Sequence, residues 1–306
     1  MMIPPEEDTK SLPEIAIHTI ILALCAIFAL MGNSLVCLAF YRNRRLRTVT
    51  NVYVLSLAVA DIMGSTLMPF SAVASGYRAW PFNFVFCQFS GFTAYLWAAI
   101  SINILALTAV NRYICIVKPH LYPALFTKKK TLFSILLVLL LTLTACLTAT
   151  FATPILFQWY PLYLTCEVTG LEIRAGVSKS IVAFVGLVMS LIIFCYGSVY
   201  HTIKRHNSIV NPSLQETTSQ VTVSPHEIQA SRVLLATVIG FAVCWIPVTV
   251  VRILNRDASL AIPSHWLSFS ALFAAFSSWI NPVIYGVMNR AMRKEFLKLL
   301  HCRSKT

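Results

Sequence analysis

The sequence predicts an all-α membrane protein: a seven-transmembrane helix bundle with a short amphipathic cytoplasmic helix after the seventh span. Hydrophobic residues make up 58% of the 306 residues and charged residues only 11%, whereas a soluble domain carries roughly a quarter charged residues. The chain contains seven apolar runs that each reach the length of about 20 residues needed to cross a bilayer. Basic residues fall in alternate gaps and the two ends lie on opposite sides, which together require an odd number of spans.

The basic residues indicate which side of the membrane each gap faces. Eighteen of the 24 Lys and Arg lie in alternate gaps or in the C-terminal tail, and the N-terminus carries Glu6, Glu7, Asp8 and Glu14. By the positive-inside rule the C-terminus is cytoplasmic and the N-terminus extracellular. The net charge of +13 is also typical of nucleic-acid binders. Its distribution follows membrane topology instead, and we expect no nucleic-acid partner.

The apolar runs divide the chain into three parts. Residues 1–14 form a short extracellular N-terminus, residues 15–289 the seven-transmembrane domain, and residues 290–306 the amphipathic helix and cytoplasmic tail. The first run is too long for a cleavable signal sequence, so we expect it to remain as a span. The spans are expected at residues 15–41, 50–75, 84–116, 131–157, 178–203, 228–254 and 264–287, with longer loops at about 158–177 outside and 204–227 inside.

The last apolar residues follow a helical stripe. Between residues 290 and 301, Met292, Phe296, Leu299 and Leu300 fall on one face and basic residues lie outside it. This pattern is typical of a helix that lies in the membrane interface. Cys302 follows directly and is either a palmitoylation site or a free thiol.

Two of the nine cysteines lie on the predicted outer side. Cys87 begins the third span and Cys166 lies in the long outer loop, so both are in the oxidising compartment and neither has another partner there. We therefore expect a disulfide that holds this loop over the mouth of the bundle.

Polar residues inside a membrane are costly and are functional candidates. Asp61 is the only carboxylate near the middle of a span, and Asn33, Ser101, Asn103 and Asn281 lie at similar depths. Asp61, Ser101 and Asn281 could converge on a pocket and bind a sodium ion, because hard cations prefer oxygen ligands. The alternative is a buried polar network that joins helices through water.

Two further features suggest moving parts. Arg112 ends the third span and Glu227 begins the sixth, so they could form an ion pair that breaks when the helices separate; an ordinary interfacial pair is the alternative. Pro247 and Pro282 each remove a helical hydrogen bond and should kink the sixth and seventh spans. Kinks are common in membrane helices, but these two lie beside Trp245 and the polar residues, as hinges would.

Seven motifs occur in order along the chain, and together they resemble the rhodopsin-like (class A) G-protein-coupled receptors. The motifs are Gly32-Asn33, Leu57-Ala58-Val59-Ala60-Asp61, Cys87, Asn111-Arg112-Tyr113, Cys166, Cys244-Trp245-Ile246-Pro247 and Asn281-Pro282-Val283-Ile284-Tyr285. The resemblance implies a ligand pocket in the outer half and a cleft for a heterotrimeric G protein on the cytoplasmic face. It also implies that Trp245 is a toggle, Arg112 and Tyr285 are activation switches, Tyr196 is their partner in span five, and Asp61 is the sodium ligand.

The chain departs from the family pattern at several positions. Asn111 replaces the usual Asp, which suggests easier release of Arg112 and higher basal activity. Span four lacks the family Trp, span five has Val188 in place of Pro, and Ser277 stands where Asn is common. Ala94 and Ala275 occupy the positions of the amine counter-ion and the retinal-linking Lys, so neither an amine nor covalently bound retinal is expected.

The resemblance extends to the melatonin-type and opsin-type branches. Residues 87–92, 111–113 and 241–245 are similar to melatonin-type receptors, although Phe184 stands in place of that group's His and Pro282 in place of its Ala. We expect a small neutral or weakly acidic ligand, with Arg252 a possible anion partner; each position could instead serve packing alone. The expected pocket residues are Tyr95, Ala98, Glu167, Ser180, Phe184, Trp245, Thr249, Arg252, Ser270 and Phe273.

The predicted function is a plasma-membrane receptor that converts extracellular binding of a small molecule into G-protein activation. The alternative is a constitutively active or non-signalling protein that acts without a ligand or as a heteromer partner. All seven His lie in loops or near span ends, and Asp61 has no acidic neighbour. An intramembrane metalloenzyme, which clusters such ligands, is therefore not expected. We expect no cofactor apart from the sodium ion, and membrane lipids as surroundings.

Overall fold

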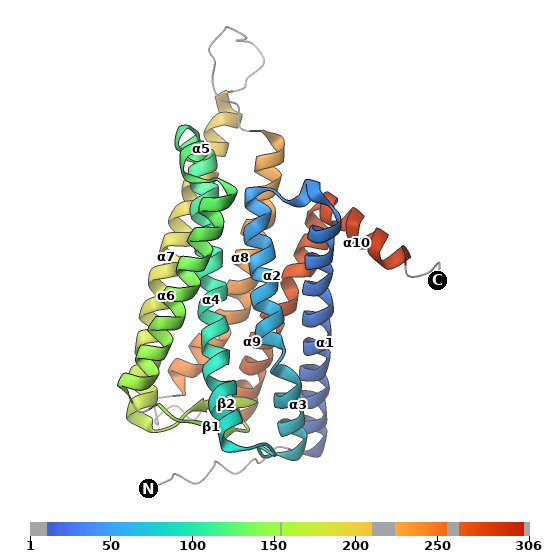
Figure 1. The fold of residues 1–306 in the computed structure, drawn as a ribbon. Helices are drawn as coiled ribbons and strands as arrows, with labels where there is room; N and C mark the ends of the chain where they lie inside the picture. The colour runs from blue at the N-terminus through green and yellow to red at the C-terminus, as the bar shows by residue number, and fades with distance from the viewer. Residues whose placement is uncertain (1–10, 154, 210–223, 256–262, 303–306) are drawn as a thin grey trace.

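The computed structural model describes residues 11–153, 155–209, 224–255 and 263–302. Seven of its helical segments are long and apolar enough to cross a membrane, and a short helix follows the last of them. The predicted fold class is therefore confirmed. Figure 1 shows the long helices side by side, with a small β-hairpin at one end and the short helix turning away at the other. We call these the hairpin end and the α10 end.

Each long helix corresponds to one apolar run. The spans are α1 (Leu12–Arg42), α2 (Val49–Ser65) continued by α3 (Met68–Tyr77), α4 (Phe84–Val117), α6 (Lys128–Ala152), α7 (Leu171–Ile209), α8 (Pro225–Leu254) and α9 (Ser264–Met288). The shorter elements are η1 (Arg44–Leu46), η2 (Pro119–Leu121), α5 (Tyr122–Leu125), β1 (Phe157–Tyr160), β2 (Thr165–Val168) and α10 (Arg290–Cys302). Side-chain oxygens of Thr48, Asn83 and Thr127 accept backbone N–H groups where α2, α4 and α6 begin. These N-caps satisfy donors that a helix leaves unpaired.

The second span differs from the single run that was expected at 50–75. It breaks between Ser65 and Met68, and α3 begins with Pro69 in its first turn. Proline has no backbone N–H and clashes with the preceding turn, so it is tolerated at the start of a helix but not within one. The break places α3 at a new angle beside α1 at the hairpin end (Figure 1).

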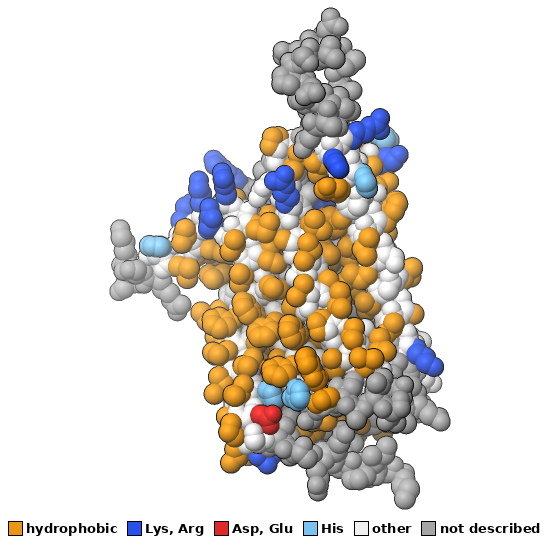
Figure 2. All heavy atoms as spheres, turned by 180° about the vertical axis from the view of Figure 1, so that it is seen from behind, with side chains coloured by type: hydrophobic (Ala, Val, Ile, Leu, Met, Phe, Trp, Pro, Cys, Tyr) orange, Lys and Arg blue, Asp and Glu red, His pale blue; other side chains and the backbone are white. Residues whose placement is uncertain are grey.

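The helices differ in how deeply they are buried. In the most apolar 18-residue window of α4, 61% of the residues are buried, but only 11% are buried in that of α6. The α4 helix therefore runs through the bundle, whereas α6 lies at its edge. Hydrophobic side chains form a broad band across the face shown in Figure 2. A soluble protein avoids so large an apolar surface, but lipid requires it.

Gly32 explains the first motif of the sequence. A Cβ atom at this position would lie 3.0 Å from Pro282 Cβ, which is tighter than ordinary contact. Glycine therefore allows α1 to pack closely on α9 at the point where Pro282 interrupts its hydrogen bonding. Next to it, the amide of Asn33 donates to the Ala29 and Ser278 carbonyl oxygens at 2.9 and 2.8 Å.

The region expected as an outer loop at 158–177 contains the hairpin. Strands β1 and β2 are antiparallel, with Phe157 opposite Val168, and α6 ends at Ala152 rather than at 157. Aromatic and β-branched residues favour strands, and this segment is rich in them. The all-α prediction therefore missed one small two-stranded sheet.

The hairpin is fastened to α4 at two points. The Cys87–Cys166 disulfide forms as predicted, with the Cα atoms 5.7 Å apart. The Gln88 amide both donates to the Phe157 carbonyl oxygen at 2.6 Å and accepts from its N–H at 2.9 Å. A Cβ at Gly91 would overlap the Phe157 ring and lie 2.9 Å from the Cys166 carbonyl oxygen. Only glycine lets the hairpin lie this close to α4.

Candidate functional site

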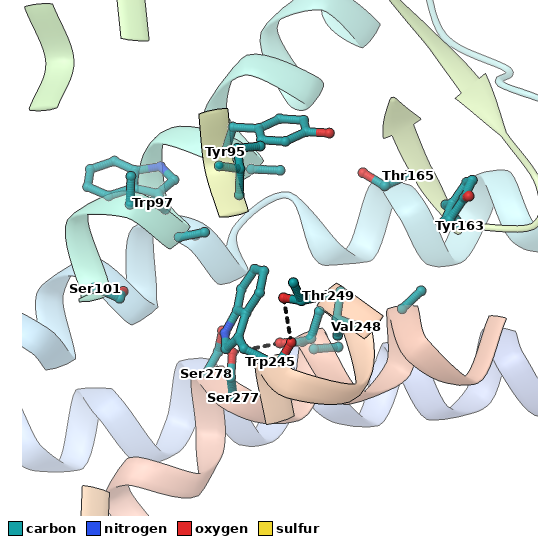
Figure 3. A pocket seen from close by; sticks show the side chains of 18 of the residues that line it. Tyr95, Trp97, Ser101, Tyr163, Thr165, Trp245, Val248, Thr249, Ser277 and Ser278 are labelled. Carbon is teal, nitrogen blue, oxygen red and sulfur yellow. Dashed lines mark hydrogen bonds between the residues drawn. The ribbon is translucent and has the colours of Figure 1, made fainter. Parts of the chain in front are cut away.

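A cavity of about 290 Å³ opens between the helices under the hairpin. Figure 3 shows Tyr95 and Trp97 of α4 on one side of it, and Trp245 and Thr249 of α8 on the other. The wall is mostly apolar, with a few hydroxyl groups and three charged side chains. An apolar cavity with a few convergent polar groups is the usual form of a small-molecule site.

Most of the predicted pocket residues lie on this wall. Seven do so, namely Tyr95, Ala98, Glu167, Phe184, Trp245, Thr249 and Arg252. The other three predicted residues lie elsewhere: Ser180 is exposed, buried Ser270 donates to the Leu267 carbonyl oxygen, and Phe273 is 38% exposed and packs on Phe276. None of these three lines the cavity.

The hairpin forms the roof of the cavity. Leu162, Tyr163 and Leu164 at its turn are buried, and Leu164 packs with Leu22 of α1 and Leu272 of α9. The α9 helix donates a hydrogen bond from the Ser268 hydroxyl to the Leu162 carbonyl oxygen at 3.1 Å. The turn is thus inserted into the bundle mouth rather than resting above it.

Two opposite charges meet at the hairpin end of the cavity. The Arg252 guanidinium of α8 donates to both carboxylate oxygens of Glu167 on β2, at 2.5 and 3.2 Å. The Tyr95 hydroxyl donates to the same carboxylate at 2.6 Å. Arg252 also lies over the Tyr163 ring, 5.3 Å from its centroid, as in a cation–π contact.

This ion pair changes the role expected for Arg252. The sequence suggested Arg252 as a partner for an anionic ligand, but Glu167 already occupies that position. Bidentate contacts between Arg and a carboxylate are among the strongest that side chains form. An anionic ligand would have to displace Glu167, whereas an uncharged one would leave the pair intact.

The other end of the cavity reaches the buried carboxylate. The Asn281 amide donates to Asp61 Oδ2 at 2.8 Å, and Ser101 and Ser277 line the cavity beside it. The Asn103 amide lies apart from this cluster, because it donates to the Thr142 hydroxyl of α6 at 3.1 Å. The predicted convergence of Asp61, Ser101 and Asn281 is thus seen as a polar cluster whose oxygen atoms are of the kind that a sodium ion binds.

A second polar cluster closes the bundle at the α10 end. Arg112 is fully buried and donates to Glu227 of α8 at 2.5 Å and to the Thr50 hydroxyl of α2 at 2.5 Å. Arg112 therefore joins α4 to α8 and to α2. The contact with Glu227 is the ion pair that the sequence suggested. The Cys115 thiol also donates to Glu227, at 3.6 Å.

Asn111 holds Arg112 more closely than the sequence suggested. Its side-chain oxygen accepts hydrogen bonds from Nε of Arg112 at 3.1 Å and from an NH2 group at 2.6 Å. Replacing Asp with Asn removes the negative charge but retains the contact. The arginine is thus constrained by a neutral acceptor as well as by Glu227.

The other predicted switch residues lie between these two clusters. Trp245 stacks on Phe241 with centroids 5.7 Å apart, and Tyr196 and Tyr285 are buried. Helix α8 continues through Pro247 and α9 through Pro282. The Tyr196 hydroxyl and the Trp245 ring N–H have no hydrogen-bond partner in the described part of the chain, so both could form new bonds after a rearrangement.

Sequence reasoning missed several contributors to these clusters. Tyr163 lies in the hairpin and Gln88 binds it, and no motif indicated the hairpin fold. The contact of Thr50 with Arg112 was not indicated by any motif either. The aromatic and β-branched residues around Cys166 were the one available signal. Cys302 lies at the last position of α10, and its side chain is outside the described residues.

Comparison with known proteins agrees with this geometry. Residues 32–285 match the family of seven-transmembrane receptors of the rhodopsin family. The chain is 28% identical to the melatonin receptor type 1A of Gallus gallus, over 97% of this chain and 84% of that one. It is 26% identical to melanopsin of Branchiostoma belcheri, over 92% of this chain and 41% of that one. Squid rhodopsin has the same fold, with a TM-score of 0.85 over 99% of this chain and 91% of that one at 19% identity.

Seven spans, a covered cavity at one end and a buried arginine at the other are the arrangement expected of a seven-transmembrane receptor. The chain belongs to the rhodopsin family, the class A G-protein-coupled receptors. It is distantly related to melatonin receptors and opsins, and it is a receptor rather than an enzyme.

Proposed function

We propose that the protein is a plasma-membrane receptor for a small, uncharged and largely apolar molecule, with the hairpin end outside the cell. The observation that carries this proposal is the Glu167–Arg252 pair, which cancels the two charges at that end of the cavity. Ala94 and Ala275 supply neither a counter-ion nor a Schiff-base lysine. Hydroxyl groups of Tyr95, Thr165 and Thr249 line the wall and are suited to orient a polar group of the ligand.

Ligand occupancy would be sensed by Trp245, which lines the cavity and lies two residues before Pro247 in α8. Movement of α8 then separates Glu227 from Arg112 and opens the α10 end to a heterotrimeric G protein. Tyr196 and Tyr285 are expected to meet the released arginine. A sodium ion at Asp61, held with the Ser101 oxygen, would favour the closed state.

The coupling step is tested by Glu227→Gln, with G-protein activation measured in reconstituted membranes without ligand. Glu227 is about one-third exposed, so the ion pair contributes on the order of 1 kcal/mol. Its loss should raise basal activation about fivefold, because 1.4 kcal/mol corresponds to a factor of ten. Glu295→Gln is the matched control, since Glu295 is an acid at the same end that contacts Asn43 and Lys298 rather than Arg112.

Two results would contradict the proposed coupling. One is equal basal activation by the two variants. The other is silence of Glu227→Gln with every G-protein class, which would favour a non-signalling partner of another receptor. A high wild-type signal that Glu227→Gln leaves unchanged would instead identify a constitutively active receptor.

A further inference from the structure

The cavity wall at Trp245 carries a hydrogen-bond donor that the described residues leave without an acceptor. The ring nitrogen of Trp245 is buried and has no partner in the described part of the chain, although the side chain lines the cavity. An indole nitrogen can only donate, and a buried donor without a partner is energetically costly. The receptor mechanism proposed above uses movement of this ring and gives its N–H group no role in binding.

A hydrogen-bond acceptor lies on the same side of the cavity. Figure 3 shows the nitrogen of the Trp245 ring directed toward Ser277 and Ser278 of α9, and both serines line the cavity. The Ser277 hydroxyl donates to the Ala274 carbonyl oxygen at 2.7 Å, so its hydrogen is committed within the helix. A hydroxyl oxygen also has two lone pairs, and Ser277 is therefore available to the cavity as an acceptor.

Other polar groups of the wall are already engaged. The Thr249 hydroxyl donates to the Trp245 carbonyl oxygen at 2.9 Å. Arg252 Nε is the second buried donor on the described wall without a partner, but it belongs to a guanidinium whose charge Glu167 balances. The Trp245–Ser277 pair differs from these groups because it offers one neutral donor and one neutral acceptor together.

We propose that the Trp245–Ser277 pair recognises a hydroxyl group and that the ligand is an apolar alcohol or phenol. This inference rests on the small-molecule receptor function proposed above and names the polar group of its ligand. A hydroxyl is the smallest group that accepts from Trp245 and donates to Ser277 at the same time. An ether or a ketone would satisfy Trp245 alone, and a hydrocarbon would satisfy neither residue.

The rest of such a ligand has to be apolar and small. The wall includes the apolar side chains of Ala98, Ile102, Phe241 and Val248. A water molecule takes about 30 Å³ in the liquid, so the cavity of about 290 Å³ has room for at least about ten groups of that size. A pair of fused aromatic rings with one hydroxyl meets both requirements, and 2-naphthol is therefore a suitable probe.

The test measures the binding of three probes to the purified full-length receptor in one detergent. The probes are 2-naphthol, 2-methoxynaphthalene and naphthalene, which differ at a single position of the ring system. A molecule that binds only the folded receptor raises Tm as its concentration increases, and this dependence gives Kd. Partition of each probe into empty micelles is measured separately and subtracted.

The variants are Ser277→Ala and Trp245→Phe, and the matched control is Ser270→Ala. Ser270 is buried on the same helix, and its hydroxyl also donates to a carbonyl oxygen three residues earlier at 2.7 Å. It does not line the cavity. The two serine variants therefore remove the same kind of intrahelical contact, and only Ser277→Ala removes an acceptor from the cavity.

The expected order of affinity follows from the number of hydrogen bonds that each probe forms. One bond changes affinity by roughly two- to tenfold, so the wild type should bind 2-naphthol about tenfold more tightly than naphthalene, with 2-methoxynaphthalene between them. Ser277→Ala should reduce the affinity for 2-naphthol to that for the ether and leave the other two probes unchanged. Trp245→Phe should weaken both oxygen-containing probes but not naphthalene, and Ser270→Ala should retain the wild-type order.

Equal affinity of the wild type for all three probes would overturn the hydroxyl inference and leave the receptor for an apolar molecule intact. An unchanged preference for 2-naphthol in Ser277→Ala, or an equal loss in Ser270→Ala, would also overturn it, because the hydroxyl would then bind elsewhere. If none of the probes raised Tm, the inference and the proposed receptor function would both be contradicted. The wild-type order and Trp245→Phe test the pair independently if Ser277→Ala does not fold.

Discussion

The Glu167–Arg252 pair predicts an asymmetric response to mutation. Glu167 is the more buried partner, with 4% of its side chain exposed against 29% for Arg252. Arg252→Ala leaves a buried carboxylate with Tyr95 as its remaining side-chain donor. Glu167→Gln leaves an arginine that cavity water and the Tyr163 ring can stabilise. Arg252→Ala should therefore destabilise the receptor more than Glu167→Gln does.

The expected magnitudes follow from the burial of each group. Removing one partner of a fully buried pair costs about 3–5 kcal/mol, and we expect about 3 kcal/mol for Arg252→Ala because the cavity admits some water. Glu167→Gln keeps a hydrogen-bonding group in place and should cost about 1–2 kcal/mol. The double variant should be less destabilised than the sum by about 2 kcal/mol, as expected for residues in direct contact.

Thermal unfolding of the purified receptor in one detergent, with all variants measured side by side, checks this prediction. A change of 1 kcal/mol corresponds to a shift in Tm of about 2–4 °C in domains of 150–250 residues, so the two single variants should differ by several degrees. Equal Tm values for the singles, or a double variant that equals their sum, would refute the reasoning. Equal Tm values would mean that the buried carboxylate is not the more costly charge to leave unpaired, and additivity would mean that the two charges do not depend on each other.

Three further predictions concern other contacts of the cavity and its roof. Gly91→Val should prevent the hairpin from packing and abolish folded receptor at the cell surface, whereas Gly186→Ala, where a Cβ meets open space, should fold normally. Asp61→Asn should remove any rise in Tm caused by sodium chloride over potassium chloride; an equal rise in both proteins would exclude a sodium site at Asp61. The Asn255 amide donates to the Tyr163 hydroxyl at 2.8 Å without lining the cavity. Asn255→Ala should thus speed association and dissociation of a bound ligand alike and leave Kd unchanged, and a change in Kd would argue against a purely gating role.

The bundle was predictable because lipid imposes a strong compositional signal. Apolar length located every span, and charge spacing predicted an odd number of them. The break at Thr66 was missed because hydropathy does not register Pro69 within an apolar run. The hairpin was missed because its strands are only four residues long. It packs on Gln88 and Gly91 of α4, which are far from it in the sequence.

The site was predictable in part for a similar reason. Residues on α4 and α8, such as Tyr95 and Thr249, were placed by counting from motifs within the same helix. Counting placed two residues wrongly relative to the cavity: Ser180 lies on α7, which carries none of the seven motifs, and Ser270 lies toward the other end of α9 from Asn281. The ion pair between Glu167 and Arg252 could not be predicted from the sequence, because the two residues are 85 positions apart and no motif connects them.

The width of the cavity has an energetic consequence for the empty receptor. Six alanines from two helices lie on the wall: Ala94, Ala98 and Ala99 on α4, and Ala271, Ala274 and Ala275 on α9. An enclosed apolar void destabilises a protein by about 24 cal/mol per Å³, and the apolar part of the cavity of about 290 Å³ that water does not fill has a cost of this kind. Larger side chains on these helices would recover some of this stability and exclude the ligand. A molecule that fills the space beside the alanine wall would recover part of this cost, so resistance to heat becomes a measure of how well it fits.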